Sequence, residues 1–94
     1  MDGWIFNRLP ELTVHDEDPD FGAWDLSERV VVACRDENGI RYGLGVYIRQ
    51  DDGQQYWAGT LEDDRDLYTT DQVCAWMPLP DRQQMWKKGK YNDL

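Results

Sequence analysis

Apolar side chains alternate with polar or small ones through the middle of the chain. The clearest run is 40–49, IRYGLGVYIR, where every second position from Ile40 to Ile48 is apolar. A period of two over ten residues is typical of a β-strand with one buried face and does not match a helix. The run 29–35, RVVVACR, is rich in β-branched residues and predicts a strand before it.

Turn signals separate this strand from its neighbours. The segment 36–39 ends in Asn-Gly, a strong hairpin signal, and 50–54 contains Asp-Asp-Gly. Two further strands are predicted at 55–61 and 72–79, joined by a polar loop at 62–71. Pro78 and Pro80 end the last strand, because proline has no N–H for a β-ladder. The pattern therefore predicts a four-stranded antiparallel meander.

The two ends of the chain are less regular. Residues 13–28 are acidic, contain Pro19 and Gly22, and are predicted to form a long loop. Residues 81–94 form a basic tail, which we expect to open as a short helix with Asp81 as its N-cap and to stop at Gly89. The whole predicts a single small domain over 1–94, mainly β or small α+β, with little helix.

Two glycines, Gly43 and Gly45, lie on one face of the central strand. Glycine weakens a strand unless something must approach it closely. One interpretation is a bulky neighbour such as Trp57 or Trp76 lying across the gap. The other is a shallow trough for a ligand or a partner strand.

The charge limits the kind of partner. The formal net charge is -9, while five tryptophans supply material for a core. An acidic surface repels nucleic acid and anionic membranes, and it suits a basic protein surface or serves solubility alone. We therefore expect no direct contact with nucleic acid or a membrane.

The cysteines and the apolar segments indicate a compartment. Cys34 and Cys74 form no C-x-x-C pair and are expected to be reduced, buried residues. The chain opens on Met-Asp-Gly-Trp without a secretory leader, and no apolar run is long enough to span a bilayer. These features predict a cytoplasmic protein.

Signals for catalysis or metal binding are weak. Asp16, Asp18 and Asp20 are spaced like the start of a calcium loop, but Phe21 and Ser27 stand where that loop needs Gly and Glu. His15 is the only histidine, so a multi-histidine metal site is excluded. The sequence has no nucleophile elbow, phosphate loop or dinucleotide fingerprint. We expect no enzyme activity, cofactor or metal.

Two groups of residues are candidates for binding. The first consists of acids in the predicted loops, which would contact a basic partner: Asp16, Glu17, Asp18, Asp20, Glu62, Asp63, Asp64 and Asp66. The second, an alternative, is an aromatic and basic set that would stack a nucleotide or another small ligand beside the glycines: Arg41, Tyr47, Arg49 and Trp57.

Two flanking motifs resemble a known family. The chain begins with WIFNRLP at 4–10 and later has VCAWMPLP at 73–80, and these resemble domain-of-unknown-function family 551, small proteins of phages and prophages. Ala75 stands where that family favours histidine, so no role of that histidine transfers. The matching residues are Trp4, Ile5, Leu9, Pro10, Val73, Trp76, Met77, Pro78, Leu79 and Pro80.

The resemblance implies a small accessory protein of a bacterial virus, acting in the host cytoplasm. With the acidic loops, it leads us to expect a protein that inhibits or redirects a host protein, such as a component of a defence system. The alternative is an oligomeric sponge that sequesters a signalling nucleotide. Edge strands with exposed aromatic residues leave a homodimer open.

Overall fold

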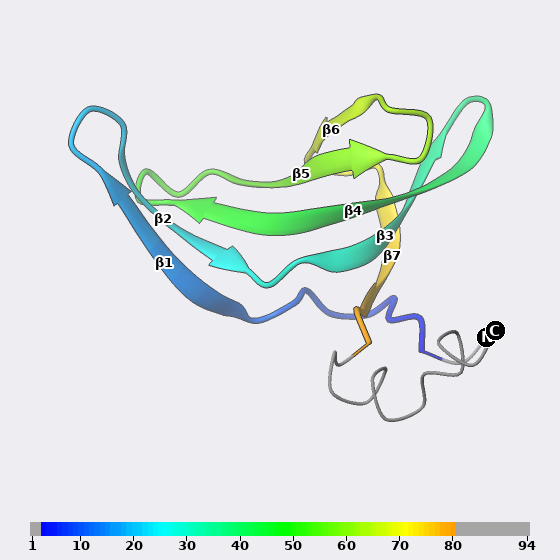
Figure 1. The fold of residues 1–94 in the computed structure, drawn as a ribbon, viewed down its shortest axis with the longest axis horizontal. Helices are drawn as coiled ribbons and strands as arrows, with labels where there is room; N and C mark the ends of the chain where they lie inside the picture. Colours follow the sequence, from blue (N-terminus) through cyan, green and yellow to red (C-terminus); the bar gives the residue numbers. More distant parts are fainter. Residues whose placement is uncertain (1–2, 81–94) are drawn as a thin grey trace, which may run out of the picture.

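The computed structural model describes residues 3–80 of the chain, and within them it is a single antiparallel sheet (Figure 1). The seven strands are β1 (Leu12–Asp18), β2 (Gly22–Ser27), β3 (Val30–Asp36), β4 (Gly39–Gln50), β5 (Gln55–Leu61), β6 (Asp66–Thr69) and β7 (Val73–Pro78). The mainly β, antiparallel fold is thus confirmed. The predicted C-terminal helix at 81–94 lies outside the described residues.

The four predicted strands are present as β3, β4, β5 and β7, but the count of four is wrong. The segment 13–28 is no loop: β1 and β2 form a hairpin there, and β6 occupies part of the predicted loop 62–71. The order also differs from a simple meander. β7 pairs with β3, while β5 pairs with β6, so the chain returns across the molecule after β6.

Strand β4 organises the sheet, and Figure 1 shows it running the length of the molecule. One edge of β4 pairs first with β3, from Gly39 to Gly45, and then with β2, from Ile48 to Gln50. Its other edge pairs with β5. Where β4 changes partners, the Tyr47 N–H donates to the hydroxyl of buried Ser27 at 2.9 Å. That hydroxyl gives the N–H a partner at the junction, where an unpaired group would be costly.

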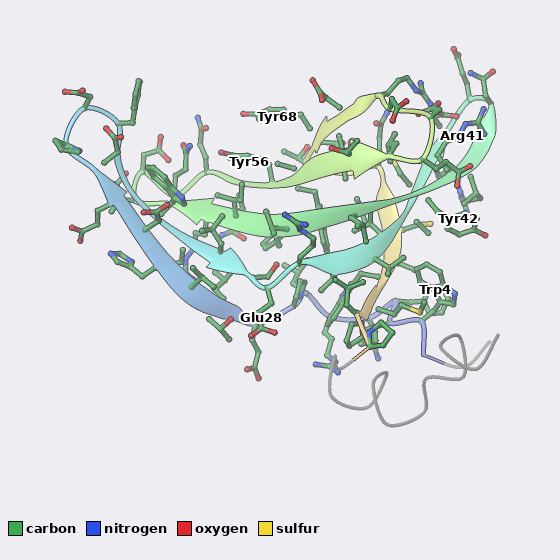
Figure 2. All side chains as sticks on the ribbon, viewed as in Figure 1. Trp4, Glu28, Arg41, Tyr42, Tyr56 and Tyr68 are labelled. Atoms are coloured by element: carbon green, nitrogen blue, oxygen red, sulfur yellow. The ribbon has the colours of Figure 1, made fainter. Side chains whose placement is uncertain are left out.

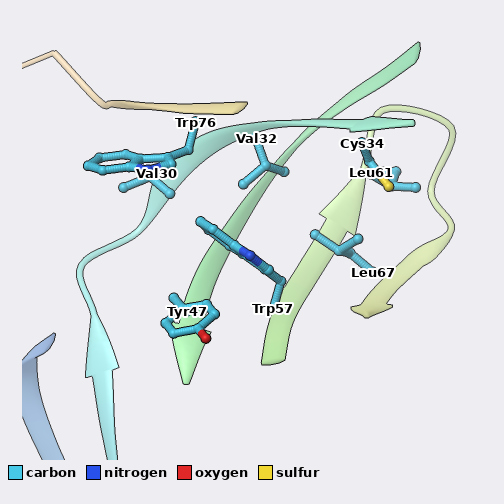
Figure 3. Close-up of a cluster of buried hydrophobic side chains, with 8 residues drawn as sticks. All are labelled: Val30, Val32, Cys34, Tyr47, Trp57, Leu61, Leu67 and Trp76. Atoms are coloured by element: carbon cyan, nitrogen blue, oxygen red, sulfur yellow. The ribbon is translucent and has the colours of Figure 1, made fainter. Parts of the chain in front are cut away.

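The sheet curls around one face, and this face holds the core (Figure 3). Strands β3 and β7 lie on one side of β4, and β5 and β6 on the other, yet their side chains meet. Tyr47 and Trp57 pack edge to face with ring centroids 5.1 Å apart. The buried cluster consists of Val30, Val32, Cys34, Tyr47, Trp57, Leu61, Leu67 and Trp76.

Glycines permit the curl at the centre of the sheet. A Cβ on Gly43 or Gly59 would overlap a backbone carbonyl of the facing strand, Thr60 or Leu44. A Cβ on Gly45 would lie 2.8 Å from the Ala58 carbonyl oxygen. The atoms nearest to the added Cβ at Gly43 and Gly45 belong to β5 and to Leu67, and none of them belongs to an indole.

The two flanking motifs meet in the structure. Ile5 and Trp76 exchange backbone hydrogen bonds of 2.7 and 3.1 Å, which extend the sheet beyond β7. The Trp76 indole N–H donates to the Arg8 carbonyl at 2.7 Å, and Pro10 is buried. The start of the chain therefore covers the β7 edge.

Replacing Trp57 by alanine should remove much of the core. Trp57 is 4% exposed, and truncating a buried aromatic residue costs about 3–5 kcal/mol of unfolding free energy. Urea denaturation followed by circular dichroism measures this loss. Phe21→Ala is the control, since Phe21 is 82% exposed and its loss should change stability by less than about 0.5 kcal/mol. Equal costs at both sites would contradict this core.

Gly59→Ala should also destabilise the protein, although it adds only one methyl group. Because the new Cβ overlaps backbone, which cannot rotate away, we expect a cost of about 3 kcal/mol, the upper end of the usual range for overpacking. Thr60→Ala, at an exposed neighbouring position of β5, should cost no more than about 1 kcal/mol. Thermal unfolding of both variants compares them, and a stable Gly59→Ala variant would refute the close strand approach.

Candidate protein-binding surface

Two acidic turns lie side by side at one end of the sheet. The β1–β2 turn is built by Asp18, whose carboxylate accepts from the N–H of Asp20 at 2.8 Å and of Phe21 at 3.2 Å. Asp51, in the β4–β5 turn, accepts from the Ala23 N–H at 3.2 Å and donates its own N–H to the Ala23 carbonyl at 3.0 Å. These bonds fix the two turns together, and we call this the hairpin end.

Among the described residues, the hairpin end carries more carboxylates than the arginines that pair with them. Arg49 lies 3.2 Å from Asp25 and is the one arginine paired there among residues 3–80. Other carboxylates of the hairpin end have no Lys or Arg nitrogen within 4.0 Å in this part of the chain: Asp16, Asp18, Asp20, Asp51 and Asp52. Acids placed on a solvated strand and two hydrogen-bonded turns present a negative field to a partner.

His15 lies between two of these carboxylates. Its Nδ1 is 2.8 Å from Asp25 and its Nε2 is 3.0 Å from Glu17, so both ring nitrogens donate when the ring is protonated. The hydrogen bond to Asp25, followed by that to Glu17, raises the pKa of His15 above its ordinary value of 6.5. The same bond from His15, with one from Arg49, lowers the pKa of Asp25.

The opposite end is better neutralised. The Arg65 guanidinium is 2.8 Å from Asp63 and 3.4 Å from Asp36, which joins the β5–β6 turn to the β3–β4 turn. Arg41 adds a third contact, 3.8 Å from Asp63 (Figure 2 labels Arg41 at this end). The predicted acids therefore form two surfaces. Asp16, Glu17, Asp18 and Asp20 lie at the hairpin end, and Glu62, Asp63, Asp64 and Asp66 lie at the Arg65 end.

The predicted aromatic and basic set does not form one site. Tyr47 and Trp57 are buried in the core, and the Tyr47 hydroxyl donates to Gln55 at 2.9 Å. Arg41 and Arg49 lie eight residues apart on β4, about 26 Å at 3.3 Å per residue. The four residues therefore do not surround a common ligand.

Sequence reasoning missed an apolar surface on the outer face of the sheet. Tyr42 and Leu44 of β4 are 48% and 41% exposed, and Tyr68 of β6 is 71% exposed. Figure 2 labels Tyr42 and Tyr68. Tyr68 stacks on Tyr56 with centroids 4.7 Å apart, and Trp4 covers Tyr42 at 5.9 Å. The alternation of 40–49 predicted that the face of Ile40, Tyr42 and Leu44 is buried, but the curl of the sheet buries the face of Tyr47 instead and leaves these three side chains exposed.

The thiols are not arranged for nucleophilic chemistry. Cys34 is buried in the core, and that burial raises the pKa of its thiol. The Cys74 thiol donates to the Ala33 carbonyl at 3.4 Å. Within the part of the chain that the structure describes, no three His, Cys, Asp or Glu side chains are grouped to hold a metal ion.

Comparison of the chain with protein-family models, with curated proteins and with solved structures gives no match. Among residues 3–80 there is no helix with the length and apolar character needed to cross a membrane.

The His15 contacts predict a titration that NMR can measure. The imidazole should titrate above pH 6.5, because both of its partners favour the protonated ring. Its contribution to stability is fully present below 6.5 and is lost as pH rises through the raised pKa. Asp25→Asn should lower the pKa of His15 more than Glu17→Gln, since Asp25 is the larger cause. A value at or below 6.5 in the unaltered protein would contradict these contacts.

Proposed function

We propose that this protein is a non-enzymatic binding protein that docks on a basic surface of a host protein and inhibits or redirects it. The observation that carries the proposal is the set of carboxylates at the hairpin end that pair with no arginine of residues 3–80. Backbone hydrogen bonds of the β1–β2 and β4–β5 turns hold these turns in place. Binding therefore costs little conformational entropy in the turns.

A purely solubilising role would not require this arrangement. Acids that serve solubility need only be exposed, whereas these are concentrated on neighbouring turns while Arg65 and Arg41 pair with acids at the other end. Fields of one sign speed association with an oppositely charged partner. The resemblance to small phage and prophage proteins supports a host protein as the target, in the host cytoplasm, and a defence component belongs to that class of target.

The test compares the two acidic ends directly. The host protein captured by the unaltered chain is identified by mass spectrometry and purified, and its affinity is measured at about 50 and 300 mM salt. The variant Asp16→Lys/Asp20→Lys keeps the Asp18 carboxylate that builds the turn and should weaken binding at least about tenfold at low salt, because attraction becomes repulsion. The matched variant Glu62→Lys/Asp66→Lys, which keeps the Asp63–Arg65 contact, should weaken it less.

Affinity that neither variant changes, with no dependence on salt, would refute docking by charge. A larger loss with the second variant would move the docking surface to the Arg65 end. Circular dichroism of both variants checks that the sheet is retained.

A further inference from the structure

The edges of the sheet are protected unequally. The edge at β7 is covered by Ile5, which takes both backbone groups of Trp76, and β7 ends at a proline. The edge at β6 is only four residues long. Strand β1 has seven residues and ends the sheet on its side, and no backbone group of residues 3–80 pairs with its outer edge. An open edge of this kind is a template for an added strand.

Register identifies which backbone groups of β1 point outward. The N–H and C=O of Ala23 bond to Asp51, away from β1, so the pair Glu17 and Ala23 exchanges no ladder bonds. In an antiparallel ladder such pairs alternate with bonded ones. His15 and Asp25 form the pair two residues along each strand, so they also exchange no ladder bonds. The N–H and C=O groups of His15 and Glu17 point to the open edge.

One of these outward groups already has a substitute partner. The Glu17 N–H donates to the Asp16 carboxylate at 2.9 Å, within the same strand. An incoming carbonyl would replace this local bond and release the carboxylate. A cationic side chain on the incoming strand would then pair with the released Asp16.

The charge of β1 selects between occupants. A second copy of β1 paired antiparallel over Val14–Asp18 would place Asp16 opposite Asp16 within two acidic strands, and like charges on facing strands are destabilising. An extended segment with Lys or Arg at alternate positions meets complementary charge instead. The irregular register between Leu12 and Val14 limits the usable edge to Val14–Asp18.

We propose that β1 binds an extended basic segment of a partner protein by strand addition, with the outward backbone groups of His15 and Glu17 forming the ladder. The inference rests on the proposed function, because it names how the basic partner is held. It adds a requirement that charge docking does not have, namely backbone hydrogen bonds along one edge of the partner segment.

The probe is a capped peptide of about eight residues that alternates lysine with valine or threonine, a usual strand length. Calorimetry with the full chain at low salt compares it with the same peptide N-methylated at alternate residues, which keeps the charge but removes donors along one edge. The parent peptide should bind, and N-methylation along the pairing edge should weaken binding at least about tenfold, the equivalent of 1.4 kcal/mol. Both N-methylation registers are tested, and a peptide with glutamate for lysine should not bind.

A substitution in the protein tests the same ladder. Glu17→Pro removes an outward N–H, whereas the matched Glu17→Gln removes only the charge. Peptide affinity should fall further in Glu17→Pro than in Glu17→Gln, and hydrogen exchange at the His15 and Glu17 amides should slow when peptide is bound. If Glu17→Pro disrupts the hairpin, the N-methylated peptides and hydrogen exchange in the unaltered protein test the ladder instead.

Three outcomes would overturn strand addition. They are equal binding of the parent and both N-methylated peptides, no binding of the parent peptide at low salt, or self-association of the chain through β1 in sedimentation. If the captured host protein still binds in a salt-dependent way that Asp16 and Asp20 control, the proposed function survives and only strand addition fails.

Discussion

The close contact between the backbones of β4 and β5 determines the shape of this molecule. Glycine occupies positions 43 and 45 of β4 and position 59 of β5, where Gly45 faces Gly59, and a side chain at any of the three would meet a carbonyl oxygen. Without side chains to hold the strands flat, the sheet can curl tightly enough for β3 and β7 to meet β5 and β6. One curled sheet thereby encloses Trp57 and Trp76, as a second layer would do in a sandwich.

The strands whose formation depends on a few neighbouring residues could be predicted from the sequence. Alternation and turn residues located β3, β4, β5 and β7, because β-branched residues and Gly or Asp turns act over a few positions. The β1–β2 hairpin was missed because its strands contain Asp and Glu, which disfavour strands on propensity alone. Its turn, with Asp18 bonding to the Asp20 and Phe21 N–H groups, compensates for that composition. The pairing of β7 with β3 was also missed, since it depends on a curl that no short pattern encodes.

The candidate sites, too, could be predicted only where they depend on neighbouring residues. Acids in turns could be placed at the ends of the sheet, because antiparallel strands bring alternate turns together. The partners of those acids could not be placed, since Arg65 contacts Asp36 across 29 positions of sequence. The set of Arg41, Tyr47, Arg49 and Trp57 failed for a related reason. The curl turns the face of Tyr47 into the core, while the length of β4 keeps the two arginines apart.

The curl also explains why the hairpin end is available for binding. The first part of β4, Gly39–Gly45, pairs with β3, which supplies Val30, Val32 and Cys34 to the core, whereas its last residues, Ile48–Gln50, pair with β2. The hairpin thus projects from the core with β1 solvated, and its stability depends on turns and charges more than on packing. Acidic residues on that edge discourage pairing between identical chains, as charged edge residues do in many sheets. The same residues favour a cationic strand, so one feature both limits self-association and defines the kind of partner that β1 can accept.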